Sequence, residues 1–374
     1  MRDVLTFLSF YDNMIRTDFT YKGENMIIPV LLFAVGLVLL IKGGDWFVDG
    51  ATGIARRFKL PEILIGATVV SIGTTLPEVM VSAQGAISGS GDMAYGNAIG
   101  SIICNTALIA ALTIAIKPGK ADRKSMIIPV CFFFGAVAFY STIAYTTGNF
   151  SRWVGIVLLL LFVIYMLLTV LQMKKNPTLA PTEGENEGEE DGGEMSDSEY
   201  YSLGFFKKAL AHVMGKRNTV ARELVLLVVG AAVIALGANL LVENGTIIAE
   251  KLGVPETVIA LTFVALGTSL PELVTAITSL AKGHGSLSLG NIIGANLFNL
   301  VLVSGVSVTI SPFPVPSASQ LFGMNASLVL DIPLMIAVTS IMIVPTLIRQ
   351  KLSRVQGVLL LVIYAAFCTV QFVM

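Results

Sequence analysis

Apolar residues along this chain gather in long windows, without the strict alternation of half-buried strands or the narrow stripe of a soluble helix. A bilayer core of about 30 Å requires roughly 20 apolar residues in helical conformation, so windows of that length bounded by charge, Gly or Pro mark candidate spans. The pattern therefore predicts an all-α integral membrane protein with ten transmembrane helices. The predicted spans cover about 26–46, 62–86, 94–116, 126–146, 153–173, 223–248, 256–281, 287–310, 328–348 and 355–373.

The amino-acid composition also indicates a protein that lies in a lipid bilayer. Hydrophobic residues make up 55% of the 374 residues and charged residues only 13%, about half of the roughly 25% usual in soluble domains. The formal net charge is −1, which gives no basic field for nucleic acid. We therefore expect the lipid bilayer as the main partner and no nucleic-acid partner.

The polar segments divide the chain. We expect an external surface segment at 1–25, a first group of five helices at 26–173, a hydrophilic loop at 174–220 and a second group of five at 221–374. The run from Glu183 to Glu199 holds nine acids and no Lys or Arg, a composition typical of a disordered linker. A calcium-sensing role is the alternative, but the run lacks the spaced ligands and Gly of an EF-hand loop.

Orientation follows from Lys and Arg, which are enriched in cytoplasmic loops. With the N-terminus outside, 18 of these residues fall in cytoplasmic segments and 5 in external ones. The bias predicts a multi-pass protein of the cell (plasma or inner) membrane with both termini outside and the acidic loop in the cytoplasm.

An internal repeat runs through the chain at an offset of 194 residues. From 61 to 105, 17 of the 45 positions recur 194 residues later, and the match is strongest at the polar elements GTTLPE (73–78) and GTSLPE (267–272). Each half holds an odd number of spans, so the second half must enter the membrane from the opposite side. The sequence therefore predicts two inverted five-helix repeats, a build common among secondary transporters with ion sites near the midplane.

The two elements lie deep inside the second and seventh spans. Pro77 and Pro271 lack an amide hydrogen, so we expect helix breaks that free the carbonyls of Gly73 and Gly267. Each element ends in a glutamate at membrane depth, where a carboxylate costs at least about 2.5–3.5 kcal/mol and is a functional candidate. The alternative is that the two carboxyls are protonated and only hydrogen-bond between helices.

Glu78 and Glu272, at equivalent repeat positions, indicate a shared site. Two carboxylates with carbonyls and hydroxyls form an oxygen cage that suits hard cations such as Ca²⁺, and their two charges balance one Ca²⁺ or two Na⁺. Each motif is followed by a G-N-x-x-G-x-x-x-x-N element, at 96–105 and 290–299. Its glycines permit close helix approach and its amides offer carbonyl ligands.

In these paired motifs the chain resembles the cation/Ca²⁺ antiporter superfamily, on its prokaryotic sodium/calcium exchanger side. The resemblance implies a secondary antiporter that exchanges Na⁺ for Ca²⁺ by alternating access, with spans one and six sliding across the ion sites. It implies Glu78 and Glu272 as central ligands of Ca²⁺ and Na⁺, and backbone carbonyls of Thr74 and Thr268 toward Ca²⁺. The residues that it implies around flanking Na⁺ positions are Ser71, Thr75, Ser101, Asn105, Ala265, Ser269 and Asn299.

The chain departs from the family pattern at two positions. Asn299 replaces an Asp that the family associates with K⁺ dependence, which favours a K⁺-independent exchanger, and Ala295 replaces a usual Ser. Exchange of three Na⁺ for one Ca²⁺ would then be electrogenic.

Two other functions compete with this prediction. A H⁺/Ca²⁺ or other divalent-cation antiporter is the main alternative, because a buried glutamate can also carry protons. An intramembrane hydrolase is remote, since His212 and His284 lie near loops rather than beside either glutamate. We expect a transporter rather than an enzyme, with Ca²⁺ and Na⁺ as transported ions and no cofactor.

Overall fold

A computed structural model describes residues 26–175, 220–252, 267–317 and 320–373. Almost all of this part is helical. The first half contains α2 (Ile27–Arg57), α3 (Glu62–Ile65), η1 (Gly66–Val70), α4 (Ser71–Ile87), α5 (Gly91–Cys104), η2 (Asn105–Ala110), α6 (Ala111–Ile116), α7 (Arg123–Thr147) and α8 (Arg152–Lys175), where η denotes a π-helical segment.

The described part of the second half follows the same order of long helices. It contains α11 (Val220–Lys251), α14 (Leu270–Ala281), α15 (Gly285–Phe298), η4 (Asn299–Val303), α16 (Ser304–Ile310), η5 (Ser327–Asp331), α17 (Ile332–Arg349) and α18 (Arg354–Val373). Two-residue strands pair as β1 (Asn149–Phe150) with β2 (Phe313–Pro314) and as β3 (Gln320–Leu321) with β4 (Met324–Asn325).

Nine helical segments of the described residues are long and apolar enough to cross a membrane, and they match nine of the ten predicted spans. The remaining span, predicted at 256–281, is represented by the shorter helix α14, and its first part lies outside the described residues. The N-terminal segment and the acidic run from Glu183 to Glu199 lie outside them as well.

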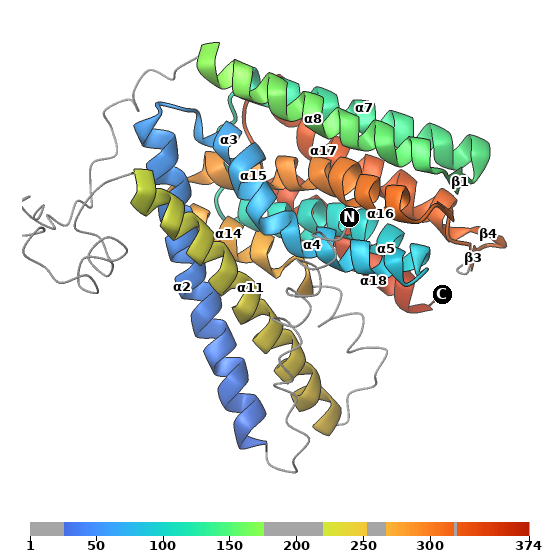
Figure 1. Cartoon of the computed structure of the whole chain (residues 1–374), viewed down its shortest axis with the longest axis horizontal. Helices are drawn as coiled ribbons and strands as arrows, with labels where there is room; N and C mark the ends of the chain where they lie inside the picture. The colour runs from blue at the N-terminus through green and yellow to red at the C-terminus, as the bar shows by residue number, and fades with distance from the viewer. Residues whose placement is uncertain (1–25, 176–219, 253–266, 318–319, 374) are drawn as a thin grey trace, which may run out of the picture.

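Helices α2 and α11 form an antiparallel pair that stands at a steep angle to the remaining bundle (Figure 1). A seam of glycines lets their backbones touch. A Cβ added to Gly36 would lie 2.9 Å from the carbonyl oxygen of Gly237, and one on Gly43 would lie 3.1 Å from that of Gly230. The first helices of the two halves thus run in opposite directions, as the predicted inversion requires.

The loops obey the same inversion. At one end of the bundle, the loop between α7 and α8 pairs through Asn149 with Pro314, in the loop after α16. At the other end, the loop after α6 pairs through Lys120 with Lys351, in the loop between α17 and α18. Each pairing joins the loop between the third and fourth helices of one repeat to the loop between the fourth and fifth helices of the other, and the two pairings lie at opposite ends of the bundle.

The prediction that the first span ends near residue 46 is wrong, because α2 continues to Arg57. Two charged side chains of this extension contact other elements: Asp49 lies beside Lys282, and Arg57 beside Glu223. Glu223 of α11 accepts hydrogen bonds from the Arg57 guanidinium at 3.0–3.2 Å. The chain leaves α2 only after Phe58, at Lys59, whose φ is positive at 51°.

The predicted break at Pro77 is also wrong, because α4 runs through it from Ser71 to Ile87. The irregular turn comes earlier, in the π-helical segment η1 at Gly66–Val70. In the second repeat the prediction is nearer to the structure: α14 begins at Leu270, directly after Gly267–Ser269, with Pro271 in its first turn. There the missing amide hydrogen costs no helical bond.

Candidate functional site

Glu78 and Glu272 meet in the interior of the bundle, on the packed helices α4 and α14. Both are fully buried, and their charges are close enough to interact. None of the four carboxyl oxygens has a hydrogen-bond partner in the described part of the chain. Because a buried carboxylate is costly unless something compensates its charge, the pair has the character of an ion site.

Several neutral side chains among the predicted site residues share this property. Buried polar atoms in folded proteins are nearly always hydrogen-bonded, but several predicted site residues depart from this rule. Counting the carboxyls, ten buried side-chain atoms without a partner among the described residues belong to just six of the predicted positions: Thr75, Glu78, Asn105, Ser269, Glu272 and Asn299.

Asn105 and Asn299 occupy equivalent places in the two repeats. Each is fully buried and begins a π-helical segment, η2 or η4, directly after α5 or α15. The wider π turn re-aims side chains and often marks functional positions. The sequence predicted these two amides but gave no sign of the π-helical turns that carry them.

The threonines and Ser71 are placed differently. The Thr74 hydroxyl donates to Oδ1 of Asn291 at 3.3 Å, and the Ser71 hydroxyl donates to the Asn291 carbonyl at 2.9 Å. Glu272 lies beside Thr74 and Thr75 of the other repeat, although no contact of its carboxyl oxygens reaches hydrogen-bonding geometry. With their hydroxyls engaged, Ser71 and Thr74 can offer only backbone carbonyls or a shared hydroxyl oxygen to an ion.

The second repeat contains the reciprocal arrangement. The Thr268 hydroxyl donates to Oδ1 of Asn97 at 3.3 Å. The Asn97 amide donates to the Glu78 carbonyl at 3.2 Å and to the Ser82 hydroxyl at 2.8 Å. Asn97 and Asn291 therefore each connect one repeat to the motif of the other. Both stand in the repeated G-N element, but the sequence assigned them no individual role.

Two predicted positions remain. Ser101 is buried on α5, one turn before Asn105. Ala265 lies outside the described residues. Within the described ranges, no group of three or more His, Cys, Asp or Glu side chains is placed to hold a metal ion. The donors that the structure gathers are two carboxylates with neutral oxygens, a set that suits Na⁺ and Ca²⁺.

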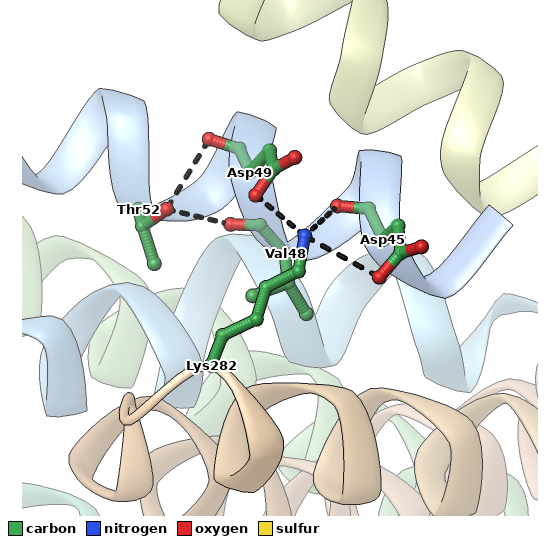
Figure 2. A network of polar contacts seen from close by, with 5 residues as sticks. All are labelled: Asp45, Val48, Asp49, Thr52 and Lys282. Atoms are coloured by element: carbon green, nitrogen blue, oxygen red, sulfur yellow. Dashed lines mark hydrogen bonds and ion pairs between the residues drawn. The ribbon is translucent and has the colours of Figure 1, made fainter. Parts of the chain in front are cut away.

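Charged residues tie α2 to the loop after α14 at one end of the bundle. The Lys282 ammonium lies 2.7 Å from the Asp49 carboxylate and 3.4 Å from that of Asp45, both on α2 (Figure 2). Nearby, Nδ1 of His284 lies 2.8 Å from the Glu62 carboxylate. This histidine therefore has its partner at the bundle end and not at Glu78 or Glu272, while His212 lies outside the described residues.

Replacing Asn291 by Leu should weaken ion binding, because the Thr74 hydroxyl would lose the side-chain oxygen that orients it, whereas Ser71 keeps the backbone carbonyls of Gly66 and Asn291 as acceptors. At about 0.5–1.5 kcal/mol for the lost hydrogen bond, the Ca²⁺ concentration for half-maximal transport should rise about two- to tenfold. Gln172→Leu is the matched control, because its amide donates to the Lys124 carbonyl at the bundle end. Equal Ca²⁺ dependence of transport in the two variants would contradict the role of the Asn291 side chain in orienting the site.

Comparison with known proteins agrees with this geometry. The sodium/calcium exchanger protein family matches residues 28–171 and 222–373. Sodium/calcium exchanger MaX1 of Methanosarcina acetivorans is 30% identical over 366 residues, which cover 91% of this chain and 98% of that protein. Inner membrane protein YrbG of Escherichia coli is 31% identical, over 77% of this chain and 81% of its own.

Solved structures give the same result. The sodium-calcium exchanger NCX_Mj soaked with 10 mM Na⁺ and 10 mM Sr²⁺ matches with a TM-score of 0.70 and 30% identity, over 91% of this chain and 98% of that one. The same exchanger soaked with zero Na⁺ and Ca²⁺ matches with a TM-score of 0.69. The predicted exchanger fold is thereby confirmed, and the chain belongs to the sodium/calcium exchanger protein family.

Proposed function

We propose that the protein is a secondary antiporter that exchanges Na⁺ for Ca²⁺ across the cell membrane by alternating access. One observation carries the proposal above the rest: Glu78 and Glu272, one from each inverted repeat, are fully buried with four carboxyl oxygens that lack partners in the described residues. A dication or two monovalent cations would neutralise that pair.

Glu78 and Glu272 are the central ligands in this proposal, for Ca²⁺ and Na⁺ alternately. In this proposal the backbone carbonyls of Thr74 and Thr268 complete the Ca²⁺ site, and the two hydroxyls donate to Asn291 and Asn97. The flanking Na⁺ positions are lined by Ser71, Thr75, Ser101, Asn105, Ala265, Ser269 and Asn299. Both ions are hard cations that favour oxygen donors.

The α2 and α11 pair supplies the moving part. The apolar side chains of Leu31, Val38 and Ile41 on α2 remain exposed, so on that side the pair meets lipid tails and not other helices. Its glycine seam keeps the two helices together, while its contact with α14 is smaller. A rigid pair with one lipid-facing side can slide across the ion site without unpacking the core.

A flux assay tests the function directly. Purified protein in sealed vesicles should take up ⁴⁵Ca²⁺ when an outward Na⁺ gradient is imposed, and should not when only a H⁺ or K⁺ gradient is imposed. Uptake driven by the H⁺ gradient alone would favour the H⁺/Ca²⁺ antiporter. A hydrolase is disfavoured by the His284–Glu62 contact, which keeps that histidine at the bundle end.

The orientation is part of the proposal. Lys282, Arg57, Lys120 and Lys351 gather at one end of the described bundle, the end that carries the paired loops after α6 and α17. Assigning this end to the cytoplasm follows the charge bias of the loops. In this orientation both termini lie outside and the acidic loop of 174–220 lies in the cytoplasm. The two repeats of the proposal are residues 26–173 and 221–374.

Asn299 should make the exchanger electrogenic and independent of K⁺. With Glu78 and Glu272 as the only charges of the site, bound Ca²⁺ is balanced, whereas three Na⁺ leave one net positive charge. Moving that charge through the membrane potential is worth ~2.3 kcal/mol per 100 mV. An inside-positive potential should therefore accelerate Na⁺ exit coupled to Ca²⁺ entry in vesicles.

The complementary variant is Asn299→Asp, which adds a carboxylate at a fully buried position. Its affinity for an additional monovalent cation should rise, and K⁺ should begin to stimulate Ca²⁺ exchange. If the membrane potential does not change the exchange rate of the parent protein, two Na⁺ are exchanged for one Ca²⁺. If Ca²⁺ exchange by the Asn299→Asp variant depends on K⁺ and Na⁺ no differently from exchange by the parent, residue 299 does not face the ions.

A further inference from the structure

One face of α14 continues the polar character of the ion site toward the end of the bundle. Glu272, Thr275 and Ser279 are spaced by three and four residues, so they share a helix face. All three are fully buried. At 1.5 Å per residue the face extends about 10 Å from Glu272 to Ser279, from the carboxylate pair toward the loop that carries Lys282.

The hydroxyls on this face are unusual because they have no hydrogen-bond partner in the described part of the chain. Buried Ser and Thr in helices commonly donate to the carbonyl four residues back. Thr339 does so to Met335 at 2.7 Å, and Ser307 to Val303 at 2.8 Å. The Thr275 and Ser279 hydroxyls do not make this bond.

The face looks into the bundle and away from the sliding pair. The neighbouring face of α14, with Val274 and Thr278, packs on α2 at Gly44, where an added Cβ would lie 2.6 Å from Cγ1 of Val274 and 2.8 Å from the Thr278 hydroxyl. Helix α14 also contacts η2, α6 and α15. A buried hydroxyl directed into such an interior requires a partner, and water is the usual one.

A small cavity lies near the C-terminal end of α14. It has a volume of about 20 Å³ and is lined by residues that include Thr113 at the end of span three, Leu280 directly after Ser279, and Ser288 on α15. This volume suffices for one water molecule. Thr275 and Ser279 do not line this cavity, so it shows room for water near the end of α14, and the polar face itself rests on the two hydroxyls.

The other repeat has no equivalent path. At the offset of 194 residues, Val81 and Gly85 stand where the second repeat has Thr275 and Ser279. The neighbouring Ser82 hydroxyl accepts a hydrogen bond from the Asn97 amide at 2.8 Å. The inverted repeats are therefore asymmetric at these two positions, and within the described residues the pair of unpartnered hydroxyls belongs to the second repeat alone.

We propose that Thr275 and Ser279 form a hydrated step in the ion pathway between Glu272 and the Lys282 end of the protein. Their hydroxyls take the place of part of the water shell of a passing Na⁺ or Ca²⁺, and the step is closed in this conformation. The inference rests on the proposed exchange function. It makes access to the site chemically different from the two sides.

Thiol labelling tests the path independently of exchange. Ser279→Cys and Thr275→Cys are made in a full-length chain whose Cys104, Cys131 and Cys368 are replaced by Ala, and the rate of reaction with a water-soluble methanethiosulfonate is measured. Ser307→Cys and Thr339→Cys are the controls, buried positions of the same residue types whose hydroxyls are bonded. Ser279→Cys should react at least about tenfold faster than both controls, and faster than Thr275→Cys.

Transport supplies the second measurement. Thr275→Val and Ser279→Ala should lower the maximal exchange rate several-fold with little change in apparent Ca²⁺ affinity, whereas Thr339→Val and Ser307→Ala should not. If the cysteines at 275 and 279 label no faster than the controls and the two variants exchange at the parent rate, the pathway is wrong and the exchange function stands. If the parent exchanges no ions but Ser279→Cys still labels rapidly, the exchange function fails and the hydrated path remains.

Discussion

Replacing either Glu78 or Glu272 by Gln is expected to abolish Ca²⁺ exchange. The substitution keeps the size of the side chain and removes one of the two charges of the site. At about 4 Å and an effective dielectric constant of about 20, one pair of unit charges is worth about 4 kcal/mol, which corresponds to a loss of roughly a thousandfold in binding. Because the two glutamates come from opposite repeats, both variants should fail to the same extent.

The matched control is Glu62→Gln, a change of the same type at a carboxylate that contacts His284 at the bundle end. It should retain exchange. Since a buried, uncompensated carboxylate costs stability, Glu78→Gln and Glu272→Gln should be at least as stable as the parent in detergent. Loss of ⁴⁵Ca²⁺ exchange with retained thermal stability is the expected pair of results. Transport by either variant at the rate of the parent protein would contradict the assignment of Glu78 and Glu272 to the ion site.

The second large effect is expected at the crossing of α15 over α3. A Cβ added to Gly290 would overlap the carbonyl oxygen of Ile63 and would lie 2.8 Å from its carbonyl carbon. These are backbone atoms of a helix and cannot rotate away, so Gly290→Ala must separate the two helices. We expect destabilisation of about 2–3 kcal/mol or more, measured as a lower unfolding temperature in detergent.

Gly135→Ala is the counterpart. Gly135 lies within α7, and an added Cβ there would meet no atom of the described residues within 4 Å. Since Ala is the better helix former by about 0.5–1 kcal/mol, this variant should be equally or slightly more stable than the parent. An unfolding temperature of Gly290→Ala equal to that of Gly135→Ala would show that the crossing is looser than the structure places it.

Much of this architecture was readable from the sequence, because a bilayer imposes a simple length rule and the repeat supplied a second copy of each element. The two glutamates and the amides at 105 and 299 were found because each motif appears twice. The position of the helix break was not readable. A proline costs one helical hydrogen bond, and α4 accepts that cost at Pro77, placing its irregular turn earlier at Gly66–Val70.

Functional residues that occur in only one repeat were missed by the sequence analysis. Thr275 and Ser279 have no polar counterparts in the first repeat, so a search for recurring residues passes over them. Asn97 and Asn291 recur, but their role lies in contacts to the opposite repeat, with sequence separations of 171 and 217 residues. No local pattern contains such a pairing. The bundle had to bring the two motifs together before either asparagine acquired a partner.

The length of the paired helices has a consequence for the surrounding lipid. Helix α2 has 31 residues and α11 has 32, or about 46–48 Å at 1.5 Å per residue, whereas the hydrocarbon layer is about 30 Å thick. Helices of that length must either tilt in the bilayer or project beyond it, and the pair stands at a steep angle to the rest of the bundle (Figure 1). Acyl-chain length therefore acts on the inclination of this pair, which makes the composition of the membrane itself a regulator of how easily the transporter changes conformation.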